Sequence, residues 1–143
     1  MGFGMKIVVD TNVIVAAFSS RRGASNALLA AAARRAFRLL ATPPLFLEYE
    51  EVLKRPEQLR RTGMSLEQID RAMRGLALII VPVEVRFLWR PQLRDADDEM
   101  VLEAAINGGA ERLVTFNARD FAKAADFGLP VVTPQQMLQE LDR

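Results

Sequence analysis

Short apolar runs that alternate with longer helical patterns constrain the fold of this chain more than any other feature. The apolar runs lack alternation with polar residues, which predicts strands buried on both faces. These runs are 6–9, 37–41, 79–83, 112–115 and 130–132. Helical patterns cover 24–36, 44–54, 65–77, 96–107, 118–125 and 134–141, and Pro or Gly marks several of their ends. This order predicts an α/β fold, a three-layer α/β/α sandwich around a central, parallel, twisted sheet.

The length of the chain sets a limit on its organisation. At 143 residues it is long enough for one domain with a substantial core. We see no linker, repeat or low-complexity segment, so we expect a single domain over 1–143. The longest apolar run, 76–83, contains Pro82 and is too short to span a membrane. No secretory signal is visible and there is no Cys, which favours a cytoplasmic protein.

The chain contains no His and no Cys, and this excludes most catalytic chemistries. There is no imidazole base, no Ser-His-Asp triad, no thiolate nucleophile and no His or Cys ligand for zinc. Four separated stretches instead bring a carboxylate to the end of an apolar run. They centre on Asp10, on Glu48, on 95–98 and on 117–120. Gathered carboxylates favour Mg²⁺ or Mn²⁺ as the bound ion.

Asp10 is the first of these acids and directly follows the first predicted strand. In open α/β sheets, sites form at the carboxyl ends of the strands, which is where Asp10 lies. An Asx turn or a helix N-cap explains an Asp here equally well. A phosphatase with Asp10 as nucleophile is disfavoured, because Asn12 stands where that chemistry needs a second Asp.

Helical periodicity narrows the choice of acids in two later segments. In the 44–54 helix, Glu48 and Glu50 border the apolar stripe on its two edges, and periodicity does not choose between them. In the 96–107 helix, Asp98 falls on the apolar face, whereas Glu99 and Glu103 fall opposite and are expected in solvent. A carboxylate on a buried face is costly unless it is paired, hydrogen-bonded or bound to metal.

Helix capping competes with a functional role for the other acids. Asp95 is a candidate N-cap, with Asp97 in the first turn, and this explains either residue without a site. Asn117 and Asp120 have the spacing of a capping box, although both are also candidates for the acidic site.

Charge is unevenly distributed along the chain. Residues 21–74 contain eleven basic and six acidic side chains, whereas 95–143 contain ten acidic and four basic ones. This asymmetry suits an enzyme that acts on a polyanion, but solvated arginines explain it as well, since Arg34, Arg35 and Arg38 are expected along one side of an Ala-rich helix. The aromatic and basic segment 86–90 is a weak candidate for base stacking.

The chain resembles the PIN-domain family, in particular the bacterial branch of toxin–antitoxin ribonucleases similar to VapC toxins. The resemblance covers nearly the whole length and depends on four segments: the Val-Val-Asp-Thr-Asn-Val opening, 44–53, 94–98 and 113–121. It implies that Asp10, Glu48 and Asp98 bind the metal. For the fourth ligand it leaves two choices, Asp120 or a neutral Asn117.

The same resemblance implies roles for smaller residues and for partners. Thr11, Asn12 and Thr115 match small polar positions that support the acids. The implied activity is that of a Mg²⁺- or Mn²⁺-dependent endoribonuclease that hydrolyses RNA. Asp120 would be one of its catalytic acids. A small antitoxin protein and a second copy of the chain, in a homodimer, are the implied partners.

Two other functional classes are considered. A catalytically inactive PIN-like module that binds RNA or serves as a scaffold is an alternative, because Asn117 stands where many relatives have an acid. A signalling receiver domain is disfavoured, because paired acids after the first strand and a Lys after a late strand are missing.

Overall fold

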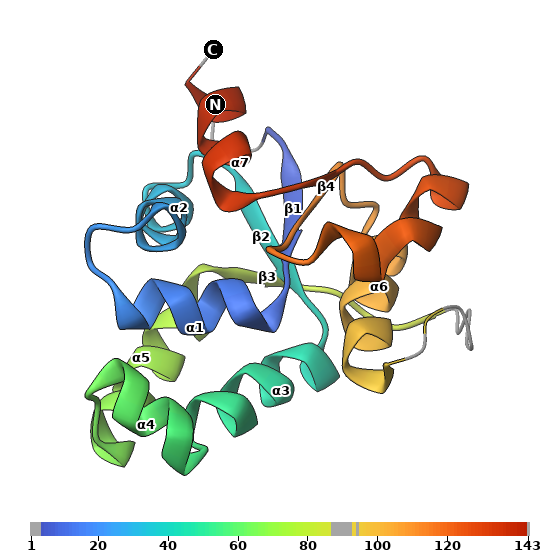
Figure 1. Ribbon diagram of the computed structural model, residues 1–143. Helices are drawn as coiled ribbons and strands as arrows, with labels where there is room; N and C mark the ends of the chain where they lie inside the picture. The colour runs from blue at the N-terminus through green and yellow to red at the C-terminus, as the bar shows by residue number, and fades with distance from the viewer. Residues whose placement is uncertain (1–3, 87–92, 94, 143) are drawn as a thin grey trace.

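A computed structural model describes residues 4–86, 93 and 95–142 of the chain (Figure 1). Its strands are β1 (Lys6–Val9), β2 (Arg38–Ala41), β3 (Ile80–Pro82), β4 (Arg112–Val114) and β5 (Val131–Val132). Its helices are α1 (Thr11–Ser19), α2 (Ala24–Ala33), α3 (Pro43–Leu53), α4 (Pro56–Thr62), α5 (Leu66–Ile79), α6 (Ala96–Gly108), the 3-10 helix η1 (Ala118–Phe127) and α7 (Pro134–Leu141). The five strands lie within one residue of the predicted runs at each end.

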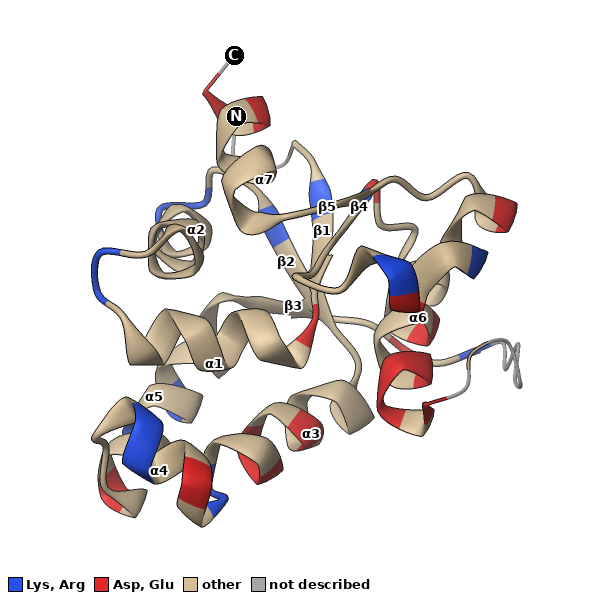
Figure 2. Cartoon of the chain, in the orientation of Figure 1, with Lys and Arg blue, Asp and Glu red and all other residues tan. Residues whose placement is uncertain are grey.

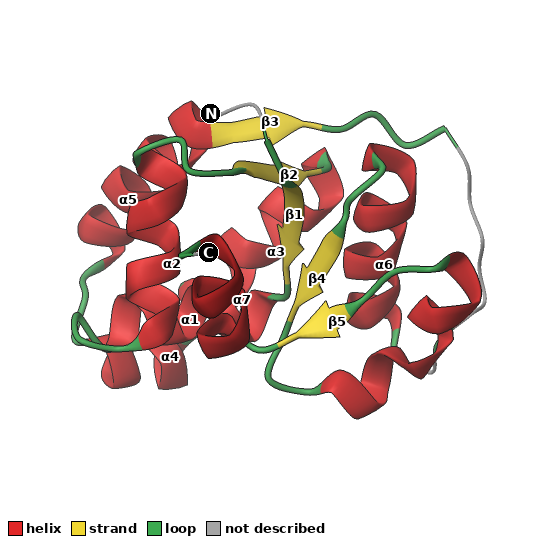
Figure 3. Ribbon diagram, turned by 90° about the horizontal axis from the view of Figure 1, so that it is seen from above, coloured by secondary structure: helices red, strands yellow, loops and turns green. Residues whose placement is uncertain are grey.

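The strands form one parallel sheet in the order β3-β2-β1-β4-β5. Figure 3 shows α6 on one face of the sheet and α1, α2 and α7 on the other. This arrangement confirms the predicted three-layer α/β/α sandwich. The order also places β1 in the centre, between a strand that follows it directly and one that the chain reaches only after β3.

Burial separates the central strands from the edge strands. The last three residues of β1 and of β2 are buried, as are Leu113 and Val114 of β4. The prediction of burial on both faces is wrong for β3, where Val81 is 40% exposed and Pro82 is exposed. Among the described residues, β3 is the last strand on its side of the sheet.

Two helices were not predicted from the sequence. α1 begins directly after Asp10, in a stretch whose β-branched residues Val13, Ile14 and Val15 do not favour a helix intrinsically. α4 begins at Pro56, which we interpreted as a helix end. Proline is also common as the first residue of a helix, where its missing N–H costs nothing.

The Ala-rich helix α2 is shorter than predicted and ends at Ala33. Arg35 adopts a left-handed conformation with φ 63°, and its N–H donates to the carbonyl of Ala32. The N–H of Ala36 donates to the carbonyl of Ala31, which completes a Schellman motif. Arg34 and Arg35 therefore lie in a turn and Arg38 begins β2, so the prediction that these three line one side of a helix is wrong.

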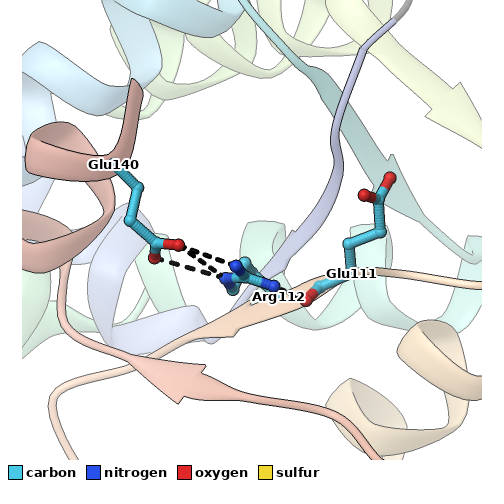
Figure 4. A network of polar contacts seen from close by, with 3 residues as sticks. All are labelled: Glu111, Arg112 and Glu140. Atoms are coloured by element: carbon cyan, nitrogen blue, oxygen red, sulfur yellow. Dashed lines mark hydrogen bonds and ion pairs between the residues drawn. The ribbon is translucent and has the colours of Figure 1, made fainter. Parts of the chain in front are cut away.

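An ion pair fixes the last helix to the sheet. Arg112 of β4 donates to Glu140 of α7, with Nη2 at 2.7 Å and Nε at 2.9 Å from Oε1 (Figure 4). Its Nη1 also donates to the carbonyl oxygen of Glu111 at 2.6 Å. The pair holds α7 beside the start of β4, at the end of the sheet opposite to Asp10.

Candidate active site

The centre of the candidate site is Asp10, at the point where the strand order reverses. The chain leaves β1 toward β2 on one side, and β4 flanks β1 on the other, which opens a crevice at their carboxyl ends. Asp10 is the first residue after β1, and only 7% of its surface is exposed. Its N–H donates to the carbonyl of Val114 at 2.8 Å, so the backbone of β4 fixes its position.

Thr115 holds the Asp10 carboxylate in place. The fully buried Thr115 donates its hydroxyl to Oδ2 of Asp10 at 2.6 Å, a charge-assisted bond. Burial raises the pKa of Asp10, while the bonds from Thr115 and from the Thr11 N–H act against that rise. Asp10 occupies the N-cap position of α1 but makes no capping bond with its side chain. Capping therefore does not account for this carboxylate.

Glu48 faces the same crevice from α3. It is only 5% exposed, and burial followed by the charge of Asp97 raises the pKa of its carboxyl. Glu50, the other acid that periodicity allowed, is paired instead with Lys54 at 3.2 Å. Glu48 and Asp97 line one cleft together with Asp10, and Glu50 does not.

Asp98 lies in the adjoining hollow, which Asp95 and Asp120 also line. Burial raises the pKa of Asp98 to about 7, and the next causes are the charges of Asp10, Asp95 and Asp120. Asp95 caps α6, since its carboxylate accepts the N–H of Asp97 at 2.8 Å. The capping explanation is therefore right for Asp95.

The remaining acids of α6 correct one prediction. Glu99 and Glu103 were expected in solvent, but they are only 5% and 6% exposed. Oε1 of Glu99 accepts the N–H of Leu93, a residue outside α6. The hydrophobic periodicity of a helix carries no information about contacts with residues outside it.

Asn117 and Asp120 do not form the predicted capping box. Asn117 is at the N-cap of η1 with an exposed side chain that makes no capping bond, and it lines neither hollow. Its N–H donates to Oγ1 of Thr115 at 3.0 Å. The segment is a 3-10 helix interrupted at Phe121, whose φ of −114° is not helical, and the spacing of an α-helical cap does not apply.

Among the described residues, the acids of the site gather without an ion-paired basic side chain. Figure 2 shows acidic residues on α3 and at the start of α6, around the end of β1. In the described part of the chain, no Lys or Arg forms an ion pair with the six acids of the two hollows. These acids are Asp10, Glu48, Asp95, Asp97, Asp98 and Asp120.

The donor set suits a hard divalent cation. Carboxylate and amide oxygens line the cleft that contains Asp10, Glu48 and Asp97. Its volume of about 190 Å³ accommodates an ion with part of its water shell. Two buried oxygens beside Asp10, Oγ1 of Thr11 and Oδ1 of Asn12, have no hydrogen-bond partner among the described residues. Across residues 4–86, 93 and 95–142, however, no three acidic side chains are close enough to hold one ion as they stand. Metal binding therefore requires these carboxylates to converge.

Three residues of the cleft were missed by sequence reasoning. Asp97 was assigned to capping, whereas its carboxylate lies beside Glu48. Gln58 and Arg61 come from α4, the helix that was not predicted. The start signal at Pro56 could have revealed that helix, but nothing in the sequence places it against α3. Most of the aromatic and basic segment 86–90 lies outside the described residues.

The fold and the site together define an α/β protein with an acidic crevice at the switch point of a parallel sheet. A family model described as PIN domain matches residues 6–119, so the chain belongs to the PIN domain family. PIN domains are typically nucleases that act on RNA, generally with divalent metal ions. No curated protein matches the chain. None of the helices in the described ranges is long and apolar enough to cross a membrane.

Proposed function

We propose that this chain is a metal-dependent endoribonuclease that hydrolyses RNA phosphodiester bonds with Mg²⁺ or Mn²⁺. The observation that carries the proposal is the gathering of carboxylates from the end of β1 and from α3, α6 and η1 at one crevice. Burial, followed by the charges of Asp10, Asp95 and Asp120, raises the pKa of Asp98 to about 7, a cost that a bound cation relieves. Membership of the PIN domain family supports the same activity.

Asp10, Glu48 and Asp98 would hold the ion, with Asp120 or Asn117 completing the set. When bound, the ion lowers the pKa of a water molecule and neutralises charge that builds on the phosphate. Thr115 orients the Asp10 carboxylate by its hydrogen bond at 2.6 Å, and the backbone N–H of Thr11 supports it. Thr11 and Asn12 place beside it the two buried oxygens that have no partner in the described ranges.

The products follow from the nucleophile. In this proposal the nucleophile is water and not the ribose 2′-hydroxyl. Hydrolysis by water breaks the bond between phosphorus and the 3′-oxygen, and the leaving oxygen takes up a proton. The expected ends are therefore a 5′-phosphate and a 3′-hydroxyl.

The test is an RNA cleavage assay with added Mg²⁺, Mn²⁺ or EDTA. Wild type should cleave only with the metals, and Asp10→Asn and Asp98→Asn should each lose most of the activity. Circular dichroism establishes that both variants fold. Cleavage that persists in EDTA, or full activity in both variants, contradicts the proposal.

We also infer that the chain is a VapC-like toxin, a single-domain cytoplasmic protein that forms a homodimer and is inhibited by a small antitoxin. The four motif segments of the sequence, 8–13, 44–53, 94–98 and 113–121, support this inference. Expression of the chain should arrest growth of a bacterial host, and Asp10→Asn should relieve that arrest. Size-exclusion chromatography with light scattering tests the dimer.

A second candidate is an inactive PIN-like module that binds RNA or serves as a scaffold. Two observations favour it. The exposed Asn117 occupies the position where a fourth acid is expected, and no three acids among the described residues are close enough to bind one ion. Purified protein that binds RNA but never cleaves it, even with Mn²⁺, would establish this function in place of the nuclease.

A further inference from the structure

The helix α4 forms one wall of the cleft that contains Asp10 and Glu48. It contacts α1 and α3, and Figure 1 shows it beneath both helices. Gln58 and Arg61 line the cleft with the acids. They are three residues apart, so both project from one face of the helix with Cβ atoms about 5–6 Å apart. Two long side chains at this spacing can reach a single nucleotide.

Gln58 presents an acceptor without a donor. Its Oε1 is buried and has no hydrogen-bond partner among the described residues. A buried acceptor left unpaired costs on the order of 1–3 kcal/mol, so a hydrogen-bond donor from a ligand is favoured at this oxygen. A phosphate cannot satisfy it, because a phosphodiester offers only acceptors. A hydroxyl group can.

Arg61 presents a cation without an anion. It is exposed, and it forms no ion pair with any acid in the described part of the chain. Two basic residues just before α4 are paired, since Lys54 contacts Glu50 and Asp70, and Arg55 contacts Glu51 at 3.7 Å. Arg61 differs from the equally exposed Arg60 in lining the cleft. A guanidinium on the wall of an otherwise acidic cleft is suited to a phosphate, which it binds with two parallel hydrogen bonds.

We propose that α4 recognises the sugar–phosphate backbone of RNA: Arg61 binds a phosphate next to the scissile one, and Oε1 of Gln58 accepts a hydrogen bond from a ribose 2′-hydroxyl. The 2′-hydroxyl is the group that distinguishes RNA from DNA, so Gln58 is a specificity-determining residue. Arg61 contributes affinity for both nucleic acids. This inference rests on the proposed nuclease function and names how its site selects a substrate.

Binding without cleavage tests the inference directly. Fluorescence anisotropy in EDTA compares a labelled oligouridine with the oligodeoxyuridine of the same length, over a range of KCl concentrations. Arg61→Ala should weaken binding of both probes about tenfold at low salt and reduce the slope of log K against log[KCl] by about 1. Arg60→Ala is the matched control: Arg60 is exposed on the same helix and does not line the cleft.

Gln58→Met keeps the length of the side chain and removes the acceptor. It should weaken RNA binding about fivefold, which is the loss expected for one neutral hydrogen bond. DNA binding should be unchanged. Gln139→Met, at an exposed position of α7, controls for the chemistry of the substitution. Thermal melts of all four variants establish that each is folded.

Three outcomes overturn the inference. If Arg61→Ala binds the probes as Arg60→Ala does, the proposed phosphate contact is wrong. If Gln58→Met weakens the binding of RNA and DNA equally, or of neither, the proposed 2′-hydroxyl contact is wrong. If wild type binds neither probe, both contacts are wrong. The cleavage assay separates these failures from that of the nuclease proposal: metal-dependent cleavage with an unaltered KM in Arg61→Ala leaves the nuclease standing and rejects α4 as its substrate wall.

Discussion

At the scale of single residues, Thr115 determines how Asp10 can act. Among the described residues, its hydroxyl donates the one side-chain hydrogen bond to this buried carboxylate. The bond opposes the rise in the pKa of Asp10 that burial causes. A carboxylate must be ionised to bind a cation, so this bond affects metal affinity as well as orientation. Thr115 is thus a positioning residue that acts through Asp10.

Replacing Thr115 with Val removes the hydroxyl and nearly preserves the shape of the side chain. We expect Thr115→Val to lower the affinity for Mn²⁺ roughly 10- to 100-fold, the range typical of partners that orient metal ligands. The measurement is a Mn²⁺ titration by calorimetry. Thr115→Ser retains the hydroxyl and should bind Mn²⁺ almost as wild type does. Equal losses in both variants would mean that packing, and not the hydrogen bond, is responsible.

Asp98 makes the stability of the metal-free protein depend on pH. Its pKa of about 7 in the folded protein lies above the ordinary aspartate value of 3.8, so between these values the native state retains a proton that the unfolded chain has lost. Stability from this group therefore falls as pH rises toward 7, and the full cost is present above 7.

Asp98→Asn should remove this pH dependence. In EDTA, the variant should melt at a higher temperature than wild type at about pH 8, and the gain should shrink toward about pH 5. Differential scanning calorimetry at the two pH values measures it. A gain of the same size at both values would show that the charge of Asp98 is not its cause.

At the scale of secondary-structure elements, α6 is held tightly against the sheet at its last residue. A Cβ added at Gly108 would lie 2.8 Å from Cδ1 of Leu40 and 2.9 Å from Cγ2 of Val83. Gly75 in α5 has no atom within 4 Å of such a Cβ. The two glycines thus differ in the space around them while both lie in helices.

Alanine at these two glycines should have opposite effects. Gly108→Ala should lower the free energy of unfolding by about 1–3 kcal/mol, because Leu40 and Val83 must move. Gly75→Ala should raise it by up to about 1 kcal/mol, because alanine favours a helix. Urea denaturation measures both. A neutral Gly108→Ala would mean that α6 can shift away from β2 without cost.

The same scale shows what the sequence could predict. All five strands were found because each leaves a short, continuous apolar run, although only the central strands are well buried. α1 was missed because its three β-branched residues resemble a strand, and α4 because Pro56 starts a helix as readily as it follows one. Asp10 and Asp98 were identified from their positions beside apolar residues. Asp97, Gln58 and Arg61 were missed because only tertiary packing brings them to the cleft.

At the scale of the whole molecule, charge is separated along the sheet. Lys6, Arg38 and Arg112 begin three neighbouring strands, and Lys6 and Arg38 are paired in register. The acidic hollows lie at the opposite ends of the strands, beyond Asp10. The starts of these strands thus carry basic side chains, of which Arg112 is paired with Glu140, and the acidic hollows lie beyond the opposite ends. Basic residues at the far edge cannot neutralise the site, because separation and screening weaken their effect.

A divalent cation should therefore stabilise the folded protein. Free ion at a hundred times its dissociation constant adds about 2.7 kcal/mol to the free energy of unfolding, which corresponds to a rise in Tm of roughly 5–10 °C. Thermal melts with Mn²⁺ or Mg²⁺ measure it. Because salt also screens repulsion between carboxylates, the control is KCl at matched ionic strength, which should produce a much smaller rise.

Two variants separate specific binding from a general effect of charge. Asp10→Asn and Glu51→Gln each remove one negative charge, but Glu51 is exposed on α3 and does not line the cleft. If the cation binds at the crevice, Asp10→Asn should abolish the rise in Tm and Glu51→Gln should leave it intact. If the two variants respond alike, the ion acts only on the overall charge, and the acids described around Asp10 do not converge on it.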